Sequence, residues 1–251
     1  MRHYGLIGYP LGHSFSASYF GNKFSKEGIE ASYRNFPLSS IEAFPELVSK
    51  EQALRGLNVT VPYKQEIIPF LDELGHTAKA IQAVNTISFR RSAGGLVLKG
   101  DNTDVTGFRQ SLEQHLESQH ESALVLGTGG SSRAVYHVLE QLGVAFTRVS
   151  RSAGEGQITY EEVHGDLVAE SKLIINTTPL GMFPQVDTCP PIPYEGISGD
   201  HLPFDLVYNP ELTLFLARGE KQGAKTVNGH DMLINQAEAS WSIWNASNTE
   251  S

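Results

Sequence analysis

One short stretch of the sequence combines a strand-like apolar run with three polar side chains. The segment GLNVTVPYK at residues 56–64 carries Asn58, Thr60 and Lys64. A buried strand gains nothing from an amide, a hydroxyl and an ammonium group, because burying an unpaired polar group costs free energy. These side chains therefore either face water or converge on a ligand. With a carboxylate such as Asp104 as its partner, the lysine is also a candidate proton donor.

Similar polar stretches stand at the ends of other predicted elements. They are HSFS (13–16), AVNT (83–86) and DNTD (101–104), and Gln236 interrupts the apolar side of the last predicted helix. An enzyme that transfers hydride to a polyhydroxylated substrate needs such donors and acceptors, together with one acid or base beside the reacting carbon. Taken singly, each residue also fits a structural role. Lys64 then becomes a solvated side chain, and Asp104 becomes a helix N-cap.

A glycine-rich segment predicts a nucleotide site. GTGGSS (127–132) follows the strand-like run ALVL and opens a predicted helix, which is the context that a dinucleotide fingerprint requires. Gly127 permits the tight turn, Gly129 lets a pyrophosphate approach the backbone, and Ser132 is small enough for close packing in place of a third glycine. The helix N-terminus adds free N–H groups. The predicted cofactor contacts are Gly127, Thr128, Gly129, Gly130, Ser131 and Ser132.

The end of the next predicted strand indicates which nucleotide binds. NAD-binding folds place an acidic residue there for the ribose 2′-hydroxyl, about twenty residues after the glycines. This chain instead has Ser150, Arg151 and Ser152. Because a guanidinium matches phosphate oxygens, we expect NADP rather than NAD. Glu155 lies close in sequence and weakens the positive field.

Strand and helix patterns alternate along the chain and predict an α/β fold. Strands are expected at 3–9, 31–36, 56–61, 83–89 and 95–100, the last two as a hairpin, and then at 123–126, 146–151, 172–178 and 204–208. Helices are expected at 14–26, 40–50, 62–74, for about three turns after 104, after 130, at 213–223 and at 229–245.

The pattern of strands and helices changes at residue 101, and this change predicts two domains. We expect an N-terminal α/β domain at residues 1–104, which binds substrate and is rejoined by residues 229–251, and a Rossmann-like NADP-binding domain at 105–228. The return of the last helix explains how Gln236 reaches a site built by the first domain. Closure of the cleft between the domains would exclude water.

Composition limits the class of protein. The 251 residues have a formal charge of −9 and no basic stripe, so nucleic acid is not expected as a partner. Cys189 stands alone, which excludes a disulfide framework and fits the reducing cytoplasm. The N-terminus lacks the apolar run of a signal peptide, and no segment has the length of a membrane span. The nine histidines show no metal-ligand spacing, so no metal site is expected.

Taken together, these motifs resemble those of the shikimate dehydrogenase family. They are GLIGYPLGHSFS, GLNVTVPYK, QAVNT, GDNTDVTGF, GTGGSSR, INTTPLGM, FDLVYNP and NGHDMLINQA, in the family's order and at about its spacing over residues 5 to 240. The resemblance implies reversible, NADPH-dependent reduction of 3-dehydroshikimate to shikimate, a step of aromatic amino acid (chorismate) biosynthesis. The expected partner is thus a small molecule, and the chain is expected to be a monomer or a homodimer.

The resemblance also implies roles for individual residues. By position, Lys64 matches the catalytic lysine and Asp104 its partner. Residues that match substrate contacts are Ser14, Ser16, Thr60, Asn85, Tyr208 and Gln236, with Asn58 beside them. Leu206 and Gly229 match the positions that line the nicotinamide. The family often has a second arginine after Arg151, where this chain has Gly154 or Glu155.

Two alternatives remain open from the sequence. One is a dehydrogenase of quinate or another hydroaromatic acid that uses NAD or NADP. The other is a non-catalytic protein that keeps the fold and senses a metabolite or nucleotide. The presence of both Lys64 and Asp104 favours an enzyme, and the paired serines Ser14 and Ser16 favour shikimate by resemblance.

Overall fold

The chain forms two compact units. The computed structural model describes residues 1–12 and 14–249. Met1–Thr103 and the chain from Gln236 onward form the first unit, and Asp104–Asn235 forms the second. The functional division at residues 104 and 228 stays a prediction. Within the described part of the chain, no helix is both long and apolar enough to cross a bilayer.

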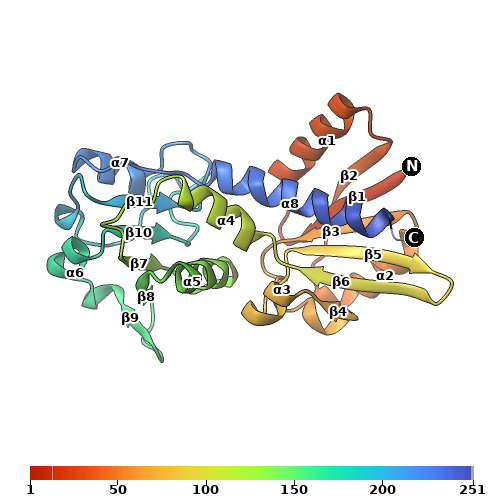
Figure 1. Ribbon diagram of the computed structural model, residues 1–251, viewed down its shortest axis with the longest axis horizontal. Coiled ribbons are helices and arrows are strands. Elements are labelled where there is room, and N and C mark those ends of the chain that lie inside the picture. Colours follow the sequence, from red (N-terminus) through yellow and green to blue (C-terminus); the bar gives the residue numbers. More distant parts are fainter. Residues whose placement is uncertain (13, 250–251) are drawn as a thin grey trace. The chain divides into compact units, whose positions relative to one another are not determined.

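The first unit contains a six-stranded sheet in the order β2-β1-β3-β5-β6-β4 (Figure 1). Its strands are β1 (Arg2–Gly8), β2 (Ala31–Pro37), β3 (Leu54–Val59), β4 (Glu73–Leu74), β5 (Thr86–Ser92) and β6 (Gly95–Asp101). Strand β1 pairs in parallel with β2 and β3, whereas β5 is antiparallel to both β3 and β6. The predicted hairpin is therefore confirmed, and it makes the sheet mixed.

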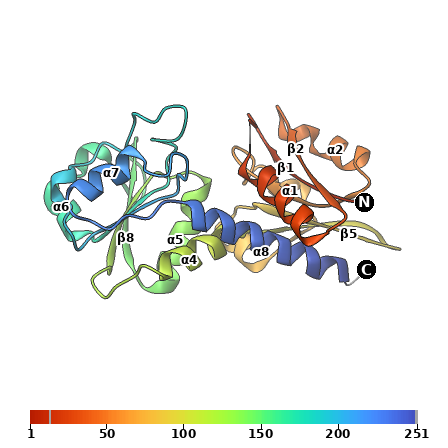
Figure 2. The ribbon, with the colours of Figure 1, turned by 90° about the horizontal axis from the view of Figure 1, so that it is seen from above.

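Helices cover both faces of this sheet. They are α1 (Phe15–Glu27), α2 (Phe44–Lys50) after the 3₁₀ turn η1 (Ile41–Ala43), α3 (His76–Ile81), and α8 (His230–Thr249), which belongs to this unit from Gln236 onward. Figure 2 shows α1 and α8 on one face and α2 on the other. Two separate apolar clusters match this arrangement, because Phe20 and Trp241 belong to one and Phe44 to the other.

The helix expected at residues 62–74 is wrong. The structure has turns there, a 3₁₀ turn η2 (Ile68–Phe70) and the short strand β4. The cause is Pro69, which has no N–H to donate to a helical hydrogen-bond ladder and whose ring would clash with the carbonyl one turn earlier. Lys64 thus lies in a turn rather than on a helix.

Trp244 of α8 packs against the middle of the sheet. Its ring lies 4.8 Å from that of Tyr4, and its indole nitrogen donates a hydrogen bond of 3.0 Å to the Ile87 carbonyl. Space for the ring exists because position 56 of β3 is glycine. A methyl group on Gly56 would lie 2.2 Å from the indole nitrogen. The glycine and the tryptophan are therefore complementary in size, and together they seat α8 on the sheet.

The second unit has a fully parallel sheet in the order β11-β10-β7-β8-β9. Its strands are β7 (Ser122–Leu126), β8 (Ala145–Ser150), β9 (Gln157–Thr159), β10 (Leu173–Asn176) and β11 (Leu202–Asp205). Its helices are α4 (Asp104–Glu113), α5 (Gly130–Leu142), α6 (Gly165–Glu170) and α7 (Leu214–Lys221), with 3₁₀ turns η3 (Tyr160–Glu162) and η4 (Tyr194–Gly196). The chain builds β7, β8 and β9 outward and then returns to place β10 on the other side of β7. This reversal is the hallmark of a Rossmann-like fold, as predicted.

Helices flank this parallel sheet on both sides. Figure 2 shows α4 and α5 on one side of the strands and α6 and α7 on the other. Successive residues of β7 alternate between the two sides, and Leu124 and Leu126 join the cluster that contains Val168 of α6 and Phe215 of α7. Burial on both faces explains why these strands are almost continuously apolar in sequence.

The substitution Gly56→Ala tests the seating of α8. The added methyl group would force Trp244 out of its place and break its hydrogen bond to Ile87, so we expect a loss of about 3 kcal/mol of stability. The free energy of unfolding in urea measures this loss. The control is Gly21→Ala on the exposed side of α1, where a methyl group meets open space. This control should gain about 0.5–1 kcal/mol. Equal effects of the two substitutions would contradict the packing argument.

Candidate functional site

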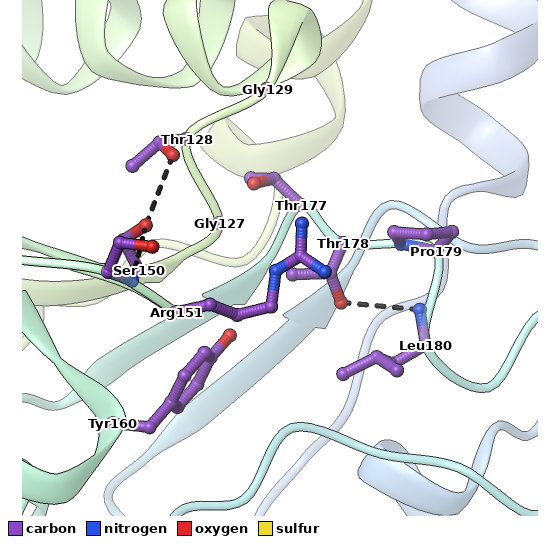
Figure 3. Close-up of a pocket in the computed structure, with 11 residues that line it drawn as sticks. Gly127, Thr128, Gly129, Ser150, Arg151, Tyr160, Thr177, Thr178, Pro179 and Leu180 are labelled. Atoms are coloured by element: carbon purple, nitrogen blue, oxygen red, sulfur yellow. Dashed lines mark hydrogen bonds between the residues drawn. The ribbon is translucent and has the colours of Figure 1, made fainter.

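The second unit contains a cavity where its strand order reverses. The cavity has a volume of about 540 Å³. It is lined by Gly127, Thr128, Gly129, Ser150, Arg151, Ser152, Tyr160, Thr177, Thr178, Pro179 and Leu180 (Figure 3). These residues follow β7, β8, β9 and β10, at the carboxyl ends of the strands. In open parallel sheets this crevice is where ligands bind.

Gly127 makes the turn that opens the cavity. Its φ of +104° lies in a region that other residues avoid. A methyl group there would also lie 2.7 Å from the Thr177 hydroxyl and 2.8 Å from a Thr178 carbon. The hydroxyl of Tyr136 donates a hydrogen bond of 2.9 Å to the Gly127 carbonyl, which anchors the turn to α5. Gly127 therefore fits the tight turn that the sequence motif predicted, and its lack of a side chain leaves room for Thr177 and Thr178.

Helix α5 begins directly after the turn. Gly129 is the N-cap of this 13-residue helix and brings no side chain, so the positive end of the helix dipole lies directly after the glycine turn. Gly130 and Ser131 form its first turn. Ser132 is fully buried and donates a hydrogen bond of 2.6 Å to the Gly129 carbonyl. These three residues shape the helix start but do not line the cavity.

Ser150, Arg151 and Ser152 border the cavity at the end of β8. The Ser150 hydroxyl lies 3.5 Å from the Thr128 hydroxyl, which links this loop to the glycine turn. The Arg151 side chain is exposed and extends across the cavity in Figure 3. Over the part of the chain that the structure describes, no carboxylate forms an ion pair with it. The guanidinium of Arg151 and the hydroxyls of Ser150 and Ser152 all border the cavity, and these are groups that suit a phosphate.

Five lining residues were missed by the sequence reasoning. Tyr160 follows β9, and Thr177, Thr178, Pro179 and Leu180 follow β10. A signal for the second group existed, because NTTPLG follows the apolar run LIIN just as GTGGSS follows ALVL. Only the strand order brings the two strand ends together. Tyr160 had no comparable signal, since the short strand β9 was not predicted.

Leu206 and Gly229 come together beyond the end of β11. A methyl group on Gly229 would lie 2.1 Å from the Leu206 carbonyl oxygen, and the Gly229 N–H donates to the Val207 carbonyl at 3.1 Å. Only glycine therefore permits this close backbone approach. Tyr208 is half-buried, and its burial raises the pKa of its phenol.

The two predicted serines lie at the start of α1 in the first unit. Ser14 is the N-cap, because its hydroxyl accepts from the Ala17 N–H at 3.2 Å, and it also donates to the Asn35 side chain at 2.8 Å. Ser16 is hydrogen-bonded to Tyr33. Both serines remain partly exposed. Residue 13 lies outside the described residues.

A chain of hydrogen bonds continues from Tyr33 into the sheet. The Tyr33 hydroxyl donates to the Asn58 side-chain oxygen at 2.7 Å. The Asn58 amide donates in turn to the Asn85 carbonyl at 3.2 Å and to the Ser240 hydroxyl at 3.1 Å. Asn58 is only 5% exposed, so its polar atoms are engaged inside the protein. It therefore positions its neighbours.

Asn85 fastens the end of β6 to the start of β5. Its side-chain oxygen accepts from the Thr103 N–H at 2.7 Å, and its amide donates to the Thr103 hydroxyl at 3.0 Å. Its backbone N–H donates to the Asp101 carbonyl at 3.1 Å. The residue after Thr103 is Asp104, which is 6% exposed and begins α4.

Ser240 of α8 lies at the centre of the same network. Its hydroxyl is 3.1 Å from the Asn58 amide, 2.8 Å from the Thr86 hydroxyl, 3.0 Å from the Thr103 hydroxyl and 2.9 Å from the Gln236 carbonyl. The predicted substrate contact Gln236 is thus tied, one helical turn earlier, to the polar ends of β3 and β5. Its side chain is buried, with 7% exposed.

Thr60 and Lys64 lie in the segment that follows β3. The Thr60 N–H donates to the Ile7 carbonyl at 2.9 Å. The Lys64 carbonyl accepts from the Val84 N–H at 2.7 Å, immediately before Asn85. The backbone hydrogen bond between residues 64 and 84 and the side chain of Asn85 therefore connect Lys64 to Thr103 in the first unit. Within the described ranges, no cluster of three histidine, cysteine or carboxylate side chains has the geometry to hold a metal ion.

Asp205 holds the carboxyl ends of β10 and β11. Its buried carboxylate accepts hydrogen bonds from Asn176 at 2.9 Å, from the Val207 N–H at 3.0 Å and from Thr213 at 2.6 Å. Burial nevertheless raises the pKa of this carboxyl to about 6, because desolvation outweighs the three donors. The folded chain therefore binds this proton more tightly than the unfolded chain, whose aspartate has an ordinary value of 3.8.

The sign of this shift gives a pH prediction. The buried Asp205 carboxyl destabilises the folded chain least below pH 4, and this destabilisation grows as the pH rises through about 6. The Asp205→Asn variant should thus gain stability relative to the wild type by about 3 kcal/mol between these limits. Urea unfolding of both proteins at each pH measures the difference. A difference that stays constant, or that shrinks as the pH rises, would contradict the assignment.

Comparison with known proteins finds a matching family model and similar sequences. A family model described as shikimate dehydrogenase substrate binding domain matches residues 6–87. A shikimate dehydrogenase (NADP(+)) from Halothermothrix orenii is 36% identical, and the match covers 96% of this chain and 89% of the relative.

Solved structures agree over nearly the whole chain. The Thermus thermophilus shikimate 5-dehydrogenase in complex with NADP(H) and shikimate is 29% identical, with a TM-score of 0.85 over 98% of this chain and 94% of that one. A quinate dehydrogenase from Corynebacterium glutamicum in complex with NAD is 26% identical, with the same TM-score and coverage. On the identity and coverage of these relatives, the chain belongs to the shikimate dehydrogenase family.

Proposed function

We propose that this chain reduces 3-dehydroshikimate to shikimate with NADPH, reversibly, in aromatic amino acid biosynthesis. The observation that carries the proposal is family membership over 96% of the chain. The cavity around Gly127 and Arg151 supports the cofactor, and the polar chain from Ser16 to Ser240 supports a hydroxylated substrate.

NADP fits the residues of the second unit. The positive-φ turn at Gly127 and the open start of α5 suit a pyrophosphate, and Arg151 with Ser150 and Ser152 suits a 2′-phosphate. In this proposal Leu206 and Gly229 lie beside the nicotinamide. Asp104–Asn235 would then be the cofactor domain, and the first unit would be the substrate domain.

The first unit supplies donors and acceptors for a carboxylate and hydroxyl groups. Ser14 and Ser16 would bind the substrate carboxylate, because both hydroxyls are partly exposed at the start of a helix. Thr60, Asn85 and Gln236 would bind substrate hydroxyls, with Tyr208 as a further contact from the second unit. The buried hydrogen bonds of Asn58 and Ser240 would hold these groups in place before substrate arrives.

Lys64 and Asp104 would carry the proton chemistry. Bound NADPH supplies the hydride for the carbonyl carbon. Lys64 in its ammonium form would donate a proton to the carbonyl oxygen as negative charge develops there, and its neutral form would accept that proton in the reverse direction. Asp104 would accept a hydrogen bond from the ammonium group and orient it. The hydrogen bond between Thr103 and Asn85 supports this arrangement, because it fixes the residue before Asp104.

Quinate oxidation with NAD is the second candidate, since a quinate dehydrogenase solved with NAD shares this fold. The purified chain should be tested with shikimate and with quinate, each with NADP⁺ and NAD⁺, by the absorbance of the reduced nicotinamide. We expect the highest kcat/KM with shikimate and NADP⁺. A preference for quinate would overturn the substrate, and no turnover with either acid would favour a sensor.

The assembly and the compartment belong to the same proposal. We infer that the chain is an enzyme that acts on a small molecule in the cytoplasm, as a monomer or a homodimer. The single cysteine supports a reducing compartment, because secreted proteins of this kind usually carry disulfides.

The substitution Lys64→Ala tests the proton donor. We expect kcat to fall by about 100- to 10,000-fold, the range for loss of a general acid, with little change in the KM for shikimate. Steady-state kinetics in the oxidative direction measure both constants. Lys79→Ala is the matched control, because Lys79 is an exposed lysine of α3 and should leave both constants unchanged. A rise in KM at constant kcat would make Lys64 a binding residue instead.

A further inference from the structure

The phenol of Tyr160 borders the cavity below Arg151. In Figure 3 its ring lies under the Arg151 side chain, with the hydroxyl oxygen directed toward it. A capping box holds the residue in place, because Thr159 and Glu162 cap the 3₁₀ turn that Tyr160 begins, and the Thr159 N–H donates to the Glu162 carboxylate at 2.7 Å. The cap thus fixes the backbone from which the Tyr160 side chain extends.

The Tyr160 hydroxyl is buried without a hydrogen-bond partner among the described residues. A buried and unsatisfied hydroxyl costs free energy, so a fold does not gain from placing one there. Desolvation raises the pKa of this phenol to about 12, although the Arg151 charge opposes the shift. The group therefore stays protonated at neutral pH and has an O–H to donate.

The cationic groups of the cavity do not satisfy all the acceptors of a phosphate. Arg151 is the one cationic side chain among the eleven lining residues drawn in Figure 3. A phosphate monoester carries a charge of about −1.5 to −2 at pH 7 and three acceptor oxygens. A single guanidinium satisfies at most part of these acceptors. Neutral donors beside Arg151 would complete the shell, and Tyr160 has the unused hydroxyl.

We propose that Tyr160 determines nucleotide specificity by donating a hydrogen bond to the 2′-phosphate that Arg151 binds. This inference rests on the proposed function, since it concerns the same cofactor. It assigns a role to a residue in η3, outside both the glycine turn and the arginine loop. It also explains why an unsatisfied hydroxyl is retained, because NADP would supply its missing acceptor.

The experiment compares Tyr160→Phe with the wild type by calorimetric titration of NADP⁺ and of NAD⁺, without any substrate. These two nucleotides differ only in the 2′-phosphate. We expect the Kd for NADP⁺ to rise about tenfold, the loss of one hydrogen bond to a charged group, and the Kd for NAD⁺ to stay unchanged. The melting temperature of the nucleotide-free variant should be equal to that of the wild type or higher, because no hydrogen bond is lost.

Two further variants make the result specific. Tyr194→Phe removes a hydroxyl that donates to the Pro190 carbonyl at 2.9 Å elsewhere in the same unit. It should lower the melting temperature and leave the ratio of the Kd for NADP⁺ to the Kd for NAD⁺ unchanged. Arg151→Ala should raise that ratio more than Tyr160→Phe does.

Three results would overturn the inference. The first is a Tyr160→Phe variant with both Kd values unchanged, the second is an equal rise of both Kd values, and the third is a wild-type chain that binds NADP⁺ no more tightly than NAD⁺. The reaction itself is measured separately, by shikimate oxidation with the wild-type chain. A failure of that assay would overturn the proposed reaction while the nucleotide titrations still decide the role of Tyr160.

Discussion

The hydrogen bond from the Thr103 N–H to the Asn85 side chain, 2.7 Å long, is the constraint on which the substrate side depends. It closes the end of β6 onto the start of β5, just before the chain enters α4. Asn85 is held in turn by Asn58, and Ser240 joins Asn58 and Thr103 to α8. Buried networks of this kind are stable only when every member is satisfied, so each polar residue depends on the others. The arrangement places the predicted binding groups on fixed backbone instead of on mobile loops.

In the second unit, the strand order creates the crevice for the cofactor. The reversal beside β7 leaves a crevice at the ends of β7 and β10, and residues at the ends of four strands border it. Gly127 keeps this crevice open, because any side chain there would collide with Thr177 and Thr178. Asp205 and Asn176 tie the ends of β10 and β11 together on the other side of the reversal. The fold thus creates the site, and the loops determine which nucleotide enters it.

Much of this was predictable from sequence, and the exceptions have physical causes. The glycine turn and Arg151 were predicted because a local motif determines them, and the hairpin at 83–100 because its turn is short. The helix at 62–74 was wrong because Pro69 overrides an otherwise helical pattern. Thr177 was missed because only the pairing of β10 with β7 brings it to the cavity, and Tyr160 was missed because the short strand β9 was not predicted. The predicted substrate contact of Asn58 stays a prediction, and its hydrogen bond to Ser240, between positions 182 residues apart, could not be read from the sequence.

The central claim is that Lys64 and Asp104 meet at the reacting oxygen of the substrate. A crystal structure of the chain with shikimate and NADP⁺ tests this most directly. We expect the Lys64 Nζ within about 3 Å of the hydroxyl that is oxidised, and an Asp104 oxygen within the same distance of that ammonium group or of that hydroxyl. A structure in which shikimate is bound but Lys64 points into solvent, or in which Asp104 is remote from both, would contradict the proposed mechanism.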